Sequence, residues 1–263
     1  SDDIVNYMLD TYGPPRDAYN DLVLWPLRGA FMTTTATFAT IFRGLAGSKR
    51  QANARPDNEE MLPLELWGYE PSPFVRPVRE KLCGLCLRHV LIPTARGSAN
   101  RDALIAKTGV QFQVPYLVDP NSGTEMFESD DIVNYMLDTY GPPRDAYNDL
   151  VLWPLRGAFM TTTATFATIF RGLAGSKRQA NARPDNEEML PLELWGYEPS
   201  PFVRPVREKL CGLCLRHVLI PTARGSANRD ALIAKTGVQF QVPYLVDPNS
   251  GTEMFESDDI VNY

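Results

Sequence analysis

The sequence has few cysteines, no long hydrophobic run and a deficit of basic residues. Four cysteines in 263 residues are too few for a disulfide-stapled secreted scaffold, so we expect a reducing compartment. No apolar run reaches the roughly 18 residues that a membrane-spanning helix requires. Lys and Arg number 26 against 32 Asp and Glu, which gives a net charge of −6. A sequence-independent nucleic-acid binder needs a basic face, so we expect no nucleic-acid partner.

The chain contains an internal repeat without divergence. Ser1–Tyr135 reappears unchanged as Ser129–Tyr263, at an offset of 128 residues. Repeated segments of identical sequence must adopt the same fold and carry the same chemistry, apart from effects at the two ends. At about 100–200 residues per domain, the length suits one or two domains, each able to bury a core.

The domain boundaries that the pattern predicts differ from the boundaries of the repeat. We expect one domain over residues 63–141, the first unit, and its copy over 191–263, the second unit, shortened within its last helix. Each unit follows a connector helix and linker, over 13–62 and 142–190. Residues 1–12 are expected to be the terminal helix of a preceding repeat, which either packs into a neighbouring molecule or marks a longer chain.

Within one unit the pattern predicts the order strand, helix, strand, helix, hairpin, helix. The strands are expected over 64–69, 89–92, 114–118 and 125–127, and the helices over 73–89, 98–107 and 129–140. A strand-helix-strand opening requires a parallel crossover, whereas a hairpin adds antiparallel strands. In roughly 80 residues this order predicts an α/β fold with a thioredoxin-like mixed sheet.

The sequence pattern of the connector in each repeat predicts one amphipathic helix. Apolar and Thr side chains recur along one helical face at Leu27, Phe31, Thr34, Phe38, Ile41 and Leu45. Five threonines between Thr33 and Thr40 lower the intrinsic helix propensity, so we expect this helix to need a packing surface. We interpret it as a connector packed on its own or a neighbouring domain. The alternative is contact with a membrane surface through 28–43 and 156–171.

Three motifs resemble the N-terminal domain of glutathione S-transferases. They are WGYEPSPFVRPVRE at 67–80, QVPYLVDP at 113–120 and MFES at 126–129. They occur in the family's order and spacing, and the resemblance covers about 80 of each 128 residues. It implies tandem thioredoxin-like domains. The closest likeness is to plastid-type tandem proteins of algae and plants, which implies a plastid (chloroplast) location, with the cytoplasm as the alternative.

The resemblance implies a glutathione site in each unit. In the family, the bond before the motif proline is cis, the preceding Val backbone pairs with the cysteinyl part of glutathione, and a Glu-Ser pair receives the γ-glutamyl carboxylate. The residues carried over are Val114, Pro115, Glu128 and Ser129, with Val242, Pro243, Glu256 and Ser257 in the second unit. Ser129 is also expected to cap a helix, whose N-terminus favours anions. The alternative is that Ser129 only caps and Pro115 only shapes a turn.

Ser72 and Ser200 fall at the family's nucleophile-activating position, in the strand-to-helix turn. A hydroxyl there could hydrogen-bond the glutathione thiolate and lower its pKa. Val75 and Val203 occupy the second redox position, which excludes dithiol exchange at this locus. The family's transferases bind their electrophile against a large helical domain. Only the connector follows each unit here, which argues against transferase activity.

The C-x-x-C motif Cys83–Cys86 invites a redox or metal interpretation. It lies two to three turns inside a predicted helix, away from the N-terminus that would acidify a thiol. One unit offers only His89 as a further ligand, so we expect packing cysteines and no metal. Zinc bridging both units through four cysteines is the alternative. His89 and His217 are interpreted as strand-start residues without a chemical role.

Two functions of different classes follow. The first is a structural or interaction scaffold with a vestigial or weak glutathione site, whose partners are other copies of the repeat or another protein. Repetition without divergence favours it, because repeated surfaces multiply weak contacts. The second is a glutathione-dependent transferase in which Ser72 and Ser200 activate the thiol. Glutathione is a possible ligand in both cases and a required cofactor in neither.

Overall fold

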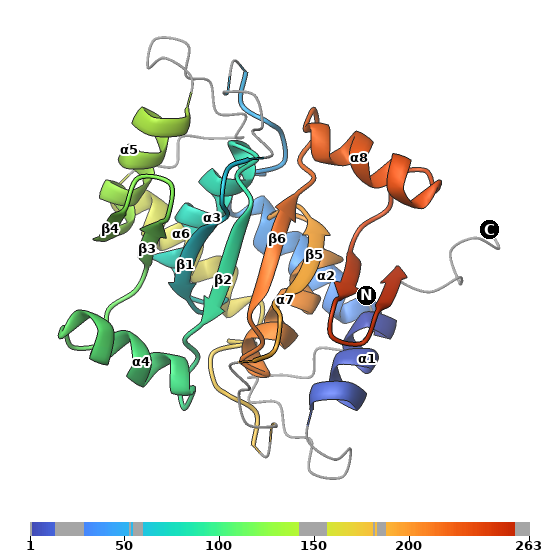
Figure 1. The fold of residues 1–263 in the computed structure, drawn as a ribbon, viewed down its shortest axis with the longest axis horizontal. Coiled ribbons are helices and arrows are strands. Elements are labelled where there is room, and N and C mark those ends of the chain that lie inside the picture. The colour runs from blue at the N-terminus through green and yellow to red at the C-terminus, as the bar shows by residue number, and fades with distance from the viewer. Residues whose placement is uncertain are drawn as a thin grey trace.

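The computed structural model contains two copies of a small α/β unit that share one sheet (Figure 1). It describes residues 2–13, 29–52, 54, 60–141, 157–180, 182 and 188–255. The first unit consists of β1 (Leu64–Gly68), α3 (Val75–Gly84), β2 (His89–Pro93), α4 (Ala99–Thr108), β3 (Tyr116–Asp119), β4 (Thr124–Phe127) and α5 (Ser129–Tyr140). The second repeats it as β5 (Leu192–Gly196), α7 (Val203–Gly212), β6 (His217–Pro221), α8 (Ala227–Thr236), β7 (Tyr244–Asp247) and β8 (Thr252–Phe255).

Local sequence signals fix where these elements begin and end. Strand β1 alternates buried and half-buried residues, as its period of two predicts. Ser98 caps α4 by accepting a hydrogen bond from the backbone N–H of Asn100, and Gly109 ends the helix in the left-handed conformation with φ 67°. Helix α3 is shorter than predicted. It ends at Gly84, and Cys86 has a φ of 57°, which a continuing α-helix does not permit.

The sheet has the strand order β4-β3-β1-β2-β6-β5-β7-β8. Within each unit the first two strands are parallel and the hairpin is antiparallel, as expected for the thioredoxin-like fold. The units join where β2 pairs with β6 in antiparallel register, with Val90 opposite Val218 at the centre. This register, with His89 opposite Leu219 and Leu91 opposite His217, relates the units by an approximate twofold axis.

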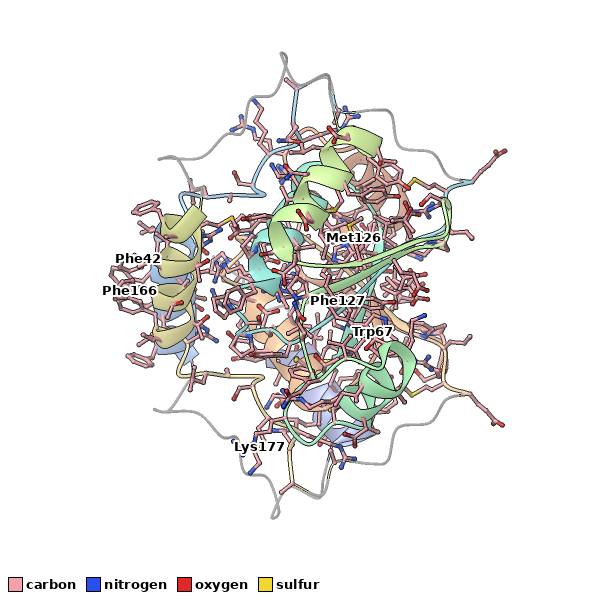
Figure 2. The ribbon with its side chains drawn as sticks, turned by 90° about the vertical axis from the view of Figure 1, so that its left-hand side faces the viewer. Phe42, Trp67, Met126, Phe127, Phe166 and Lys177 are labelled. Atoms are coloured by element: carbon pink, nitrogen blue, oxygen red, sulfur yellow. The ribbon has the colours of Figure 1, made fainter. Side chains whose placement is uncertain are left out.

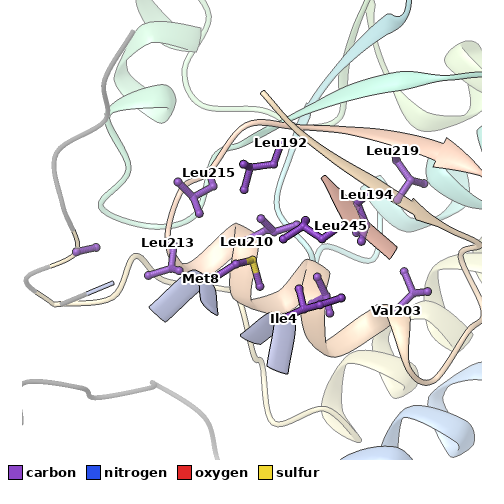
Figure 3. Packing of buried hydrophobic residues seen from close by; sticks show 12 residues of the cluster. Ile4, Met8, Leu192, Leu194, Val203, Leu210, Leu213, Leu215, Leu219 and Leu245 are labelled. Atoms are coloured by element: carbon purple, nitrogen blue, oxygen red, sulfur yellow. The ribbon is translucent and has the colours of Figure 1, made fainter. Parts of the chain in front are cut away.

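The N-terminal helix α1 (Asp2–Tyr12) packs on the second unit (Figure 3). Ile4 and Met8 are completely buried there, in one cluster with Leu194, Leu210 and Leu245. In the first unit, α5 fills the same position. We predicted residues 1–12 as the terminal helix of a preceding repeat. The sequence of residues 2–12 equals that of 130–140, and in the structure the same apolar face occupies the equivalent site of the second unit.

Polar contacts fix α1 in the same way as α5. Tyr7 donates a hydrogen bond of 2.5 Å to the Asp247 carboxylate, and Tyr12 donates to the same oxygen. In the first unit, Tyr135 and Tyr140 make the same contacts with Asp119. Each carboxylate therefore holds a terminal helix against the turn that follows the third strand of its unit. The copy of this helix predicted from Ser257 onward lies outside the described residues.

The connector helices α2 (Gly29–Ile41) and α6 (Gly157–Ile169) lie side by side in an outer layer, separated from the sheet by α3 and α7 (Figure 2). Packing of these helices was predicted, but the buried face is not the predicted one. Ala36 and Ala39 are completely buried, whereas Phe31 and Phe38 of the apolar stripe are half exposed. Small side chains let the helix backbone approach its neighbours closely, which large aromatic rings would prevent.

Candidate functional site

The serines at the proposed thiol-activating position are buried. Ser72 and Ser200 are each 1% exposed, and their hydroxyl oxygens accept hydrogen bonds of 3.3 Å from the backbone N–H groups of Val75 and Val203. The Ser72 and Ser200 carbonyls also accept the N–H groups of Arg76 and Arg204, so each serine caps the turn that leads into α3 or α7, where the first N–H groups lack partners within the helix. Sequence reasoning placed both serines correctly at the strand-to-helix turn. The structure assigns their hydroxyls a capping contact at that position.

The loop that carries Ser72 is held by the other half of the chain. Thr168 of α6 donates a hydrogen bond of 2.8 Å to the Pro71 carbonyl. Cys211 accepts a 3.3 Å bond from the N–H of Glu70. The second unit repeats these contacts, with Thr40 donating to the Pro199 carbonyl. The side chain and backbone groups around each serine are therefore occupied by contacts between the two halves.

The other glutathione residues of the first unit lie in a different environment. Pro115 is buried and Val114 is half-buried beside the core, and the peptide bond between them is cis. Glu128 is exposed and takes the N-cap position of α5 with a φ of 68°. Ser129 is the first helical residue. The prediction that it caps the helix is therefore wrong. Gln113 donates a hydrogen bond to the Glu128 carboxylate.

In the second unit, Val242 and Pro243 have the same environment and the same cis bond. The predicted residues Glu256 and Ser257 lie outside the described residues. In the first unit, the pairing of Tyr116 with Phe127 and the Gln113–Glu128 hydrogen bond bring the Val114–Pro115 and Glu128–Ser129 segments together at the start of α5. Asp130 and Asp131, both exposed in the first turn of α5, compete there with a ligand carboxylate for the helix N-terminus.

A cluster of buried ion pairs, which the sequence pattern did not predict, joins the units between α3 and α7. Arg79 contacts the Glu198 carboxylate at 3.2 Å through Nε and 3.3 Å through Nη2. Arg207 contacts Glu70 in the same two-pronged way, at 3.3 and 3.2 Å. All four side chains are almost completely buried. Burial alone would raise the pKa of Glu70, but Arg207 and Arg79 lower it to about 2, so the carboxylate stays ionised.

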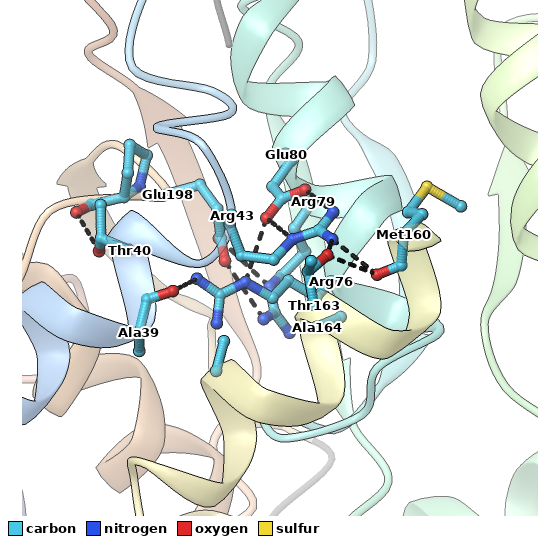
Figure 4. Close-up of polar contacts among 12 residues, drawn as sticks. Ala39, Thr40, Arg43, Arg76, Arg79, Glu80, Met160, Thr163, Ala164 and Glu198 are labelled. Carbon is cyan, nitrogen blue, oxygen red and sulfur yellow. Dashed lines mark hydrogen bonds and ion pairs between the residues drawn. The ribbon is translucent and has the colours of Figure 1, made fainter. Parts of the chain in front are cut away.

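A second set of ion pairs ties the connectors to the units (Figure 4). Arg43, just after α2, donates to Glu80 of α3, with 2.8 Å between Nε and Oε1. The same guanidinium reaches α6, where Thr163 accepts a bond of 2.6 Å. Arg76 completes the group at 3.1 Å from Glu80. Arg171 and Glu208 form the equivalent pair. Buried ion pairs thus hold each connector against α3 or α7.

The C-x-x-C cysteines are buried packing residues, as predicted. None of the four forms a disulfide. Cys83 accepts a hydrogen bond of 3.3 Å from the N–H of Glu198, so this packing lies at the boundary between the units. Burial raises the pKa of the Cys83 and Cys211 thiols, which keeps them protonated and unreactive.

His89 and His217 begin β2 and β6, the strands that join the units. The Nδ1 of His89 contacts the Leu87 carbonyl at 3.0 Å, so this nitrogen carries the proton. The Nε2 atoms of both rings are buried, without a hydrogen-bond partner among the described residues. Burial lowers the pKa of His89 to about 3 and that of His217 to about 4, and Arg79 and Arg207 add repulsion to both.

These two histidines should make the fold sensitive to acid. An unfolded histidine has a pKa of about 6.5, so below that pH the unfolded chain binds protons that the folded chain excludes. We expect the free energy of unfolding to fall by several kcal/mol as the pH drops from about 6.5 to about 4. Urea denaturation at several pH values measures it. The double variant His89→Asn with His217→Asn should flatten the curve, and an unchanged curve would contradict the assignment.

The described residues hold no group of three or more His, Cys, Asp or Glu side chains that could bind a metal ion. Among the same residues, the helices are too short or too polar to cross a membrane.

Comparison with known protein families supports the fold of each unit. The family model for the N-terminal domain of glutathione S-transferase matches residues 66–144 and 194–263. No curated protein and no solved structure matches the chain significantly. The two matches cover more than half of the sequence, and each begins within the first strand of a unit. They also agree with the mixed four-stranded sheet that each unit forms. The chain therefore belongs to the glutathione S-transferase N-terminal domain family, whose domain it carries twice.

Proposed function

We propose that this protein is a structural interaction module, in which two transferase-like domains form a closed pair and the glutathione site is vestigial. One observation carries the proposal: the hydroxyls of Ser72 and Ser200 are buried and cap helices. A hydroxyl that activates a thiol must be within hydrogen-bond reach of the bound sulfur. At 1% exposure, neither hydroxyl can be reached by a ligand without displacing the connector that covers its loop.

The two ends of glutathione therefore differ in how well the site fits them. Around Glu128 and Ser129, the exposed start of α5 can accept the γ-glutamyl end, weakened by the neighbouring Asp130 and Asp131. Near Ser72, the residues present do not fit the thiol end. This difference supports weak binding without activation of the sulfur. The alternative, a transferase, requires the Pro71 and Pro199 loops to be released from Thr168 and Thr40.

A paired set of variants tests the proposal in the full chain. We expect Ser72→Ala with Ser200→Ala to lower the free energy of unfolding by about 1 kcal/mol for each lost cap. The rate of glutathione conjugation to a chromogenic electrophile should not change. The matched control is Ser98→Ala with Ser226→Ala, since these serines are also buried caps, at the start of α4 and α8.

The outcomes separate the two functions. Equal stability losses in both double variants, with conjugation at the background rate throughout, support the structural module. A loss of conjugation of about tenfold or more, confined to Ser72→Ala with Ser200→Ala, would establish the transferase instead. Calorimetric titration of the unchanged chain with glutathione completes the test. Sub-millimolar binding that Ser72→Ala weakens would also favour the transferase.

A further inference from the structure

The outer layer of the molecule carries an apolar face that no described part of the chain covers. Phe31 and Phe38 of α2, and Phe159 and Phe166 of α6, each leave about half of their surface exposed. Phe42 and Phe170, which follow these helices, stack on each other with their ring centroids 5.0 Å apart. We call these six side chains the aromatic face. Figure 2 shows Phe42 and Phe166 on the side of the helix pair turned away from the sheet.

The aromatic face is continuous across both helices. Phe38 stacks on Phe170 at 6.1 Å, and Phe42 stacks on Phe166 at 5.9 Å, so the rings alternate between the two helices. Exposed aliphatic side chains extend it at Ile41, Leu45, Ile169 and Leu173. At half exposure, the four exposed rings alone present about 300–500 Å². This is as large as the largest apolar patch of a typical monomer, and such patches mark interaction sites.

The face also lacks charge. Arg43 and Arg171 are the only charged residues in 29–48 and 157–176, and both are buried in ion pairs. The exposed hydroxyl of Thr37 donates to the carbonyl four residues earlier, as those of Thr34, Thr162 and Thr165 do. These hydroxyls are already paired within their helices, which lowers the cost of removing the face from water.

We propose that the aromatic face binds the same face of a second copy of this chain. The face carries identical residues from α2 and α6 about the approximate twofold axis and has no exposed charge, so two copies can meet in an isologous contact without charge repulsion. If α2 and α6 of one copy packed on α2 and α6 of a second copy, aromatic rings would stack across the contact as Phe42 and Phe170 do within one chain. With the aliphatic border included, the area approaches the roughly 800 Å² per partner of a standard protein interface.

A membrane surface fits the face less well. Amphipathic helices that bind membranes combine an apolar face with exposed Lys and Arg that attract anionic lipids. Arg43 and Arg171 cannot supply that attraction because Glu80 and Glu208 hold them in the interior. The predicted membrane segments begin at residues 28 and 156, which lie outside the described residues. The net charge of −6 also opposes approach to an anionic surface.

Sedimentation of the full chain at physiological salt tests the proposal. We expect a species of twice 29.5 kDa to form as the concentration rises from about 1 to about 100 µM. Phe38→Ser with Phe166→Ser should weaken this dimer at least about tenfold, because buried aromatic side chains dominate interface energies. The control is Leu62→Ser with Leu190→Ser, which alters two equally exposed apolar side chains beside β1 and β5 and should leave the dimer intact.

Several outcomes would overturn the proposal. They are a monomer at the highest concentration, a dimer that survives Phe38→Ser with Phe166→Ser, and binding to phosphatidylcholine vesicles, with or without phosphatidylserine, that this variant abolishes. Thermal unfolding of each variant confirms that the fold persists. This proposal rests on the structural role argued above, but its test measures the mass of the particle and not conjugation activity. A monomer with inactive serines would therefore reject only the dimer, and a transferase that dimerises would reject only the structural role.

Discussion

Replacing Arg79 by alanine is expected to lower the free energy of unfolding by about 3–5 kcal/mol. Arg79 is completely buried and pairs with the Glu198 carboxylate of the other unit. Its removal leaves that carboxylate buried with Arg207 as its remaining close cation. Water cannot reach the Glu198 carboxylate to replace the lost partner. The free energy of desolvating this charge is then no longer offset, and the folded state is destabilised. Urea denaturation of the full chain gives the difference.

An exposed ion pair in the same unit provides the control. Lys107 and Glu125 lie 2.8 Å apart, with about two fifths of each side chain exposed. Such pairs contribute about 0–1 kcal/mol, so Lys107→Ala should have little effect. Arg207→Ala should equal Arg79→Ala, because the sequence repeat makes the two arginines equivalent. If Arg79→Ala costs no more than Lys107→Ala, the buried cluster does not hold the units together.

The second large effect concerns α1. We expect Ile4→Ala to cost about 2–5 kcal/mol, the usual range for emptying a buried aliphatic site. Ile4 is completely buried between α1 and the second unit, just as Ile132 is buried in the first. Ile132→Ala should therefore cost about the same amount. Denaturant unfolding of the two variants, compared with the unchanged chain, measures both.

The matched control for this prediction lies on the same helix. Asn6 is exposed, so Asn6→Ala should change stability by no more than about 0.5 kcal/mol. A helix that did not pack on the second unit would give a different pattern. In that case Ile4→Ala would resemble Asn6→Ala, while Ile132→Ala would keep its full cost.

The elements of each unit could be predicted because short-range rules decide them. Ser98 and Gly109 bound α4 through capping and a left-handed residue, which depend on neighbours only a few positions away. Alternation in β1 and the turn after Asp119 are equally local. The candidate site was predicted in part. Ser72 was placed at the correct turn, but its burial was not predicted, and the loop that carries it is held by Thr168, which is 96 positions further along the chain.

The connector shows where local reasoning is insufficient. Its spacing identified Phe31 and Phe38 as residues of one helical face, and the structure places this face on the outer side, half exposed. Spacing cannot say whether a face meets protein or water. The neighbours decided that, because α3 and α7 offer buried carboxylates to Arg43 and Arg171 and accept the small side chains on the opposite face of each helix.

The sequence by itself determined the family, the elements of each unit and the identity of the two copies, since these follow from motifs and local periodicity. Only the tertiary structure decided how the copies meet, which unit receives α1, and that Ser72 and Ser200 are covered. The physical reason is that these outcomes depend on pairing between residues distant in sequence. The affinity of Arg79 for Glu198 depends on burial that neither residue specifies alone.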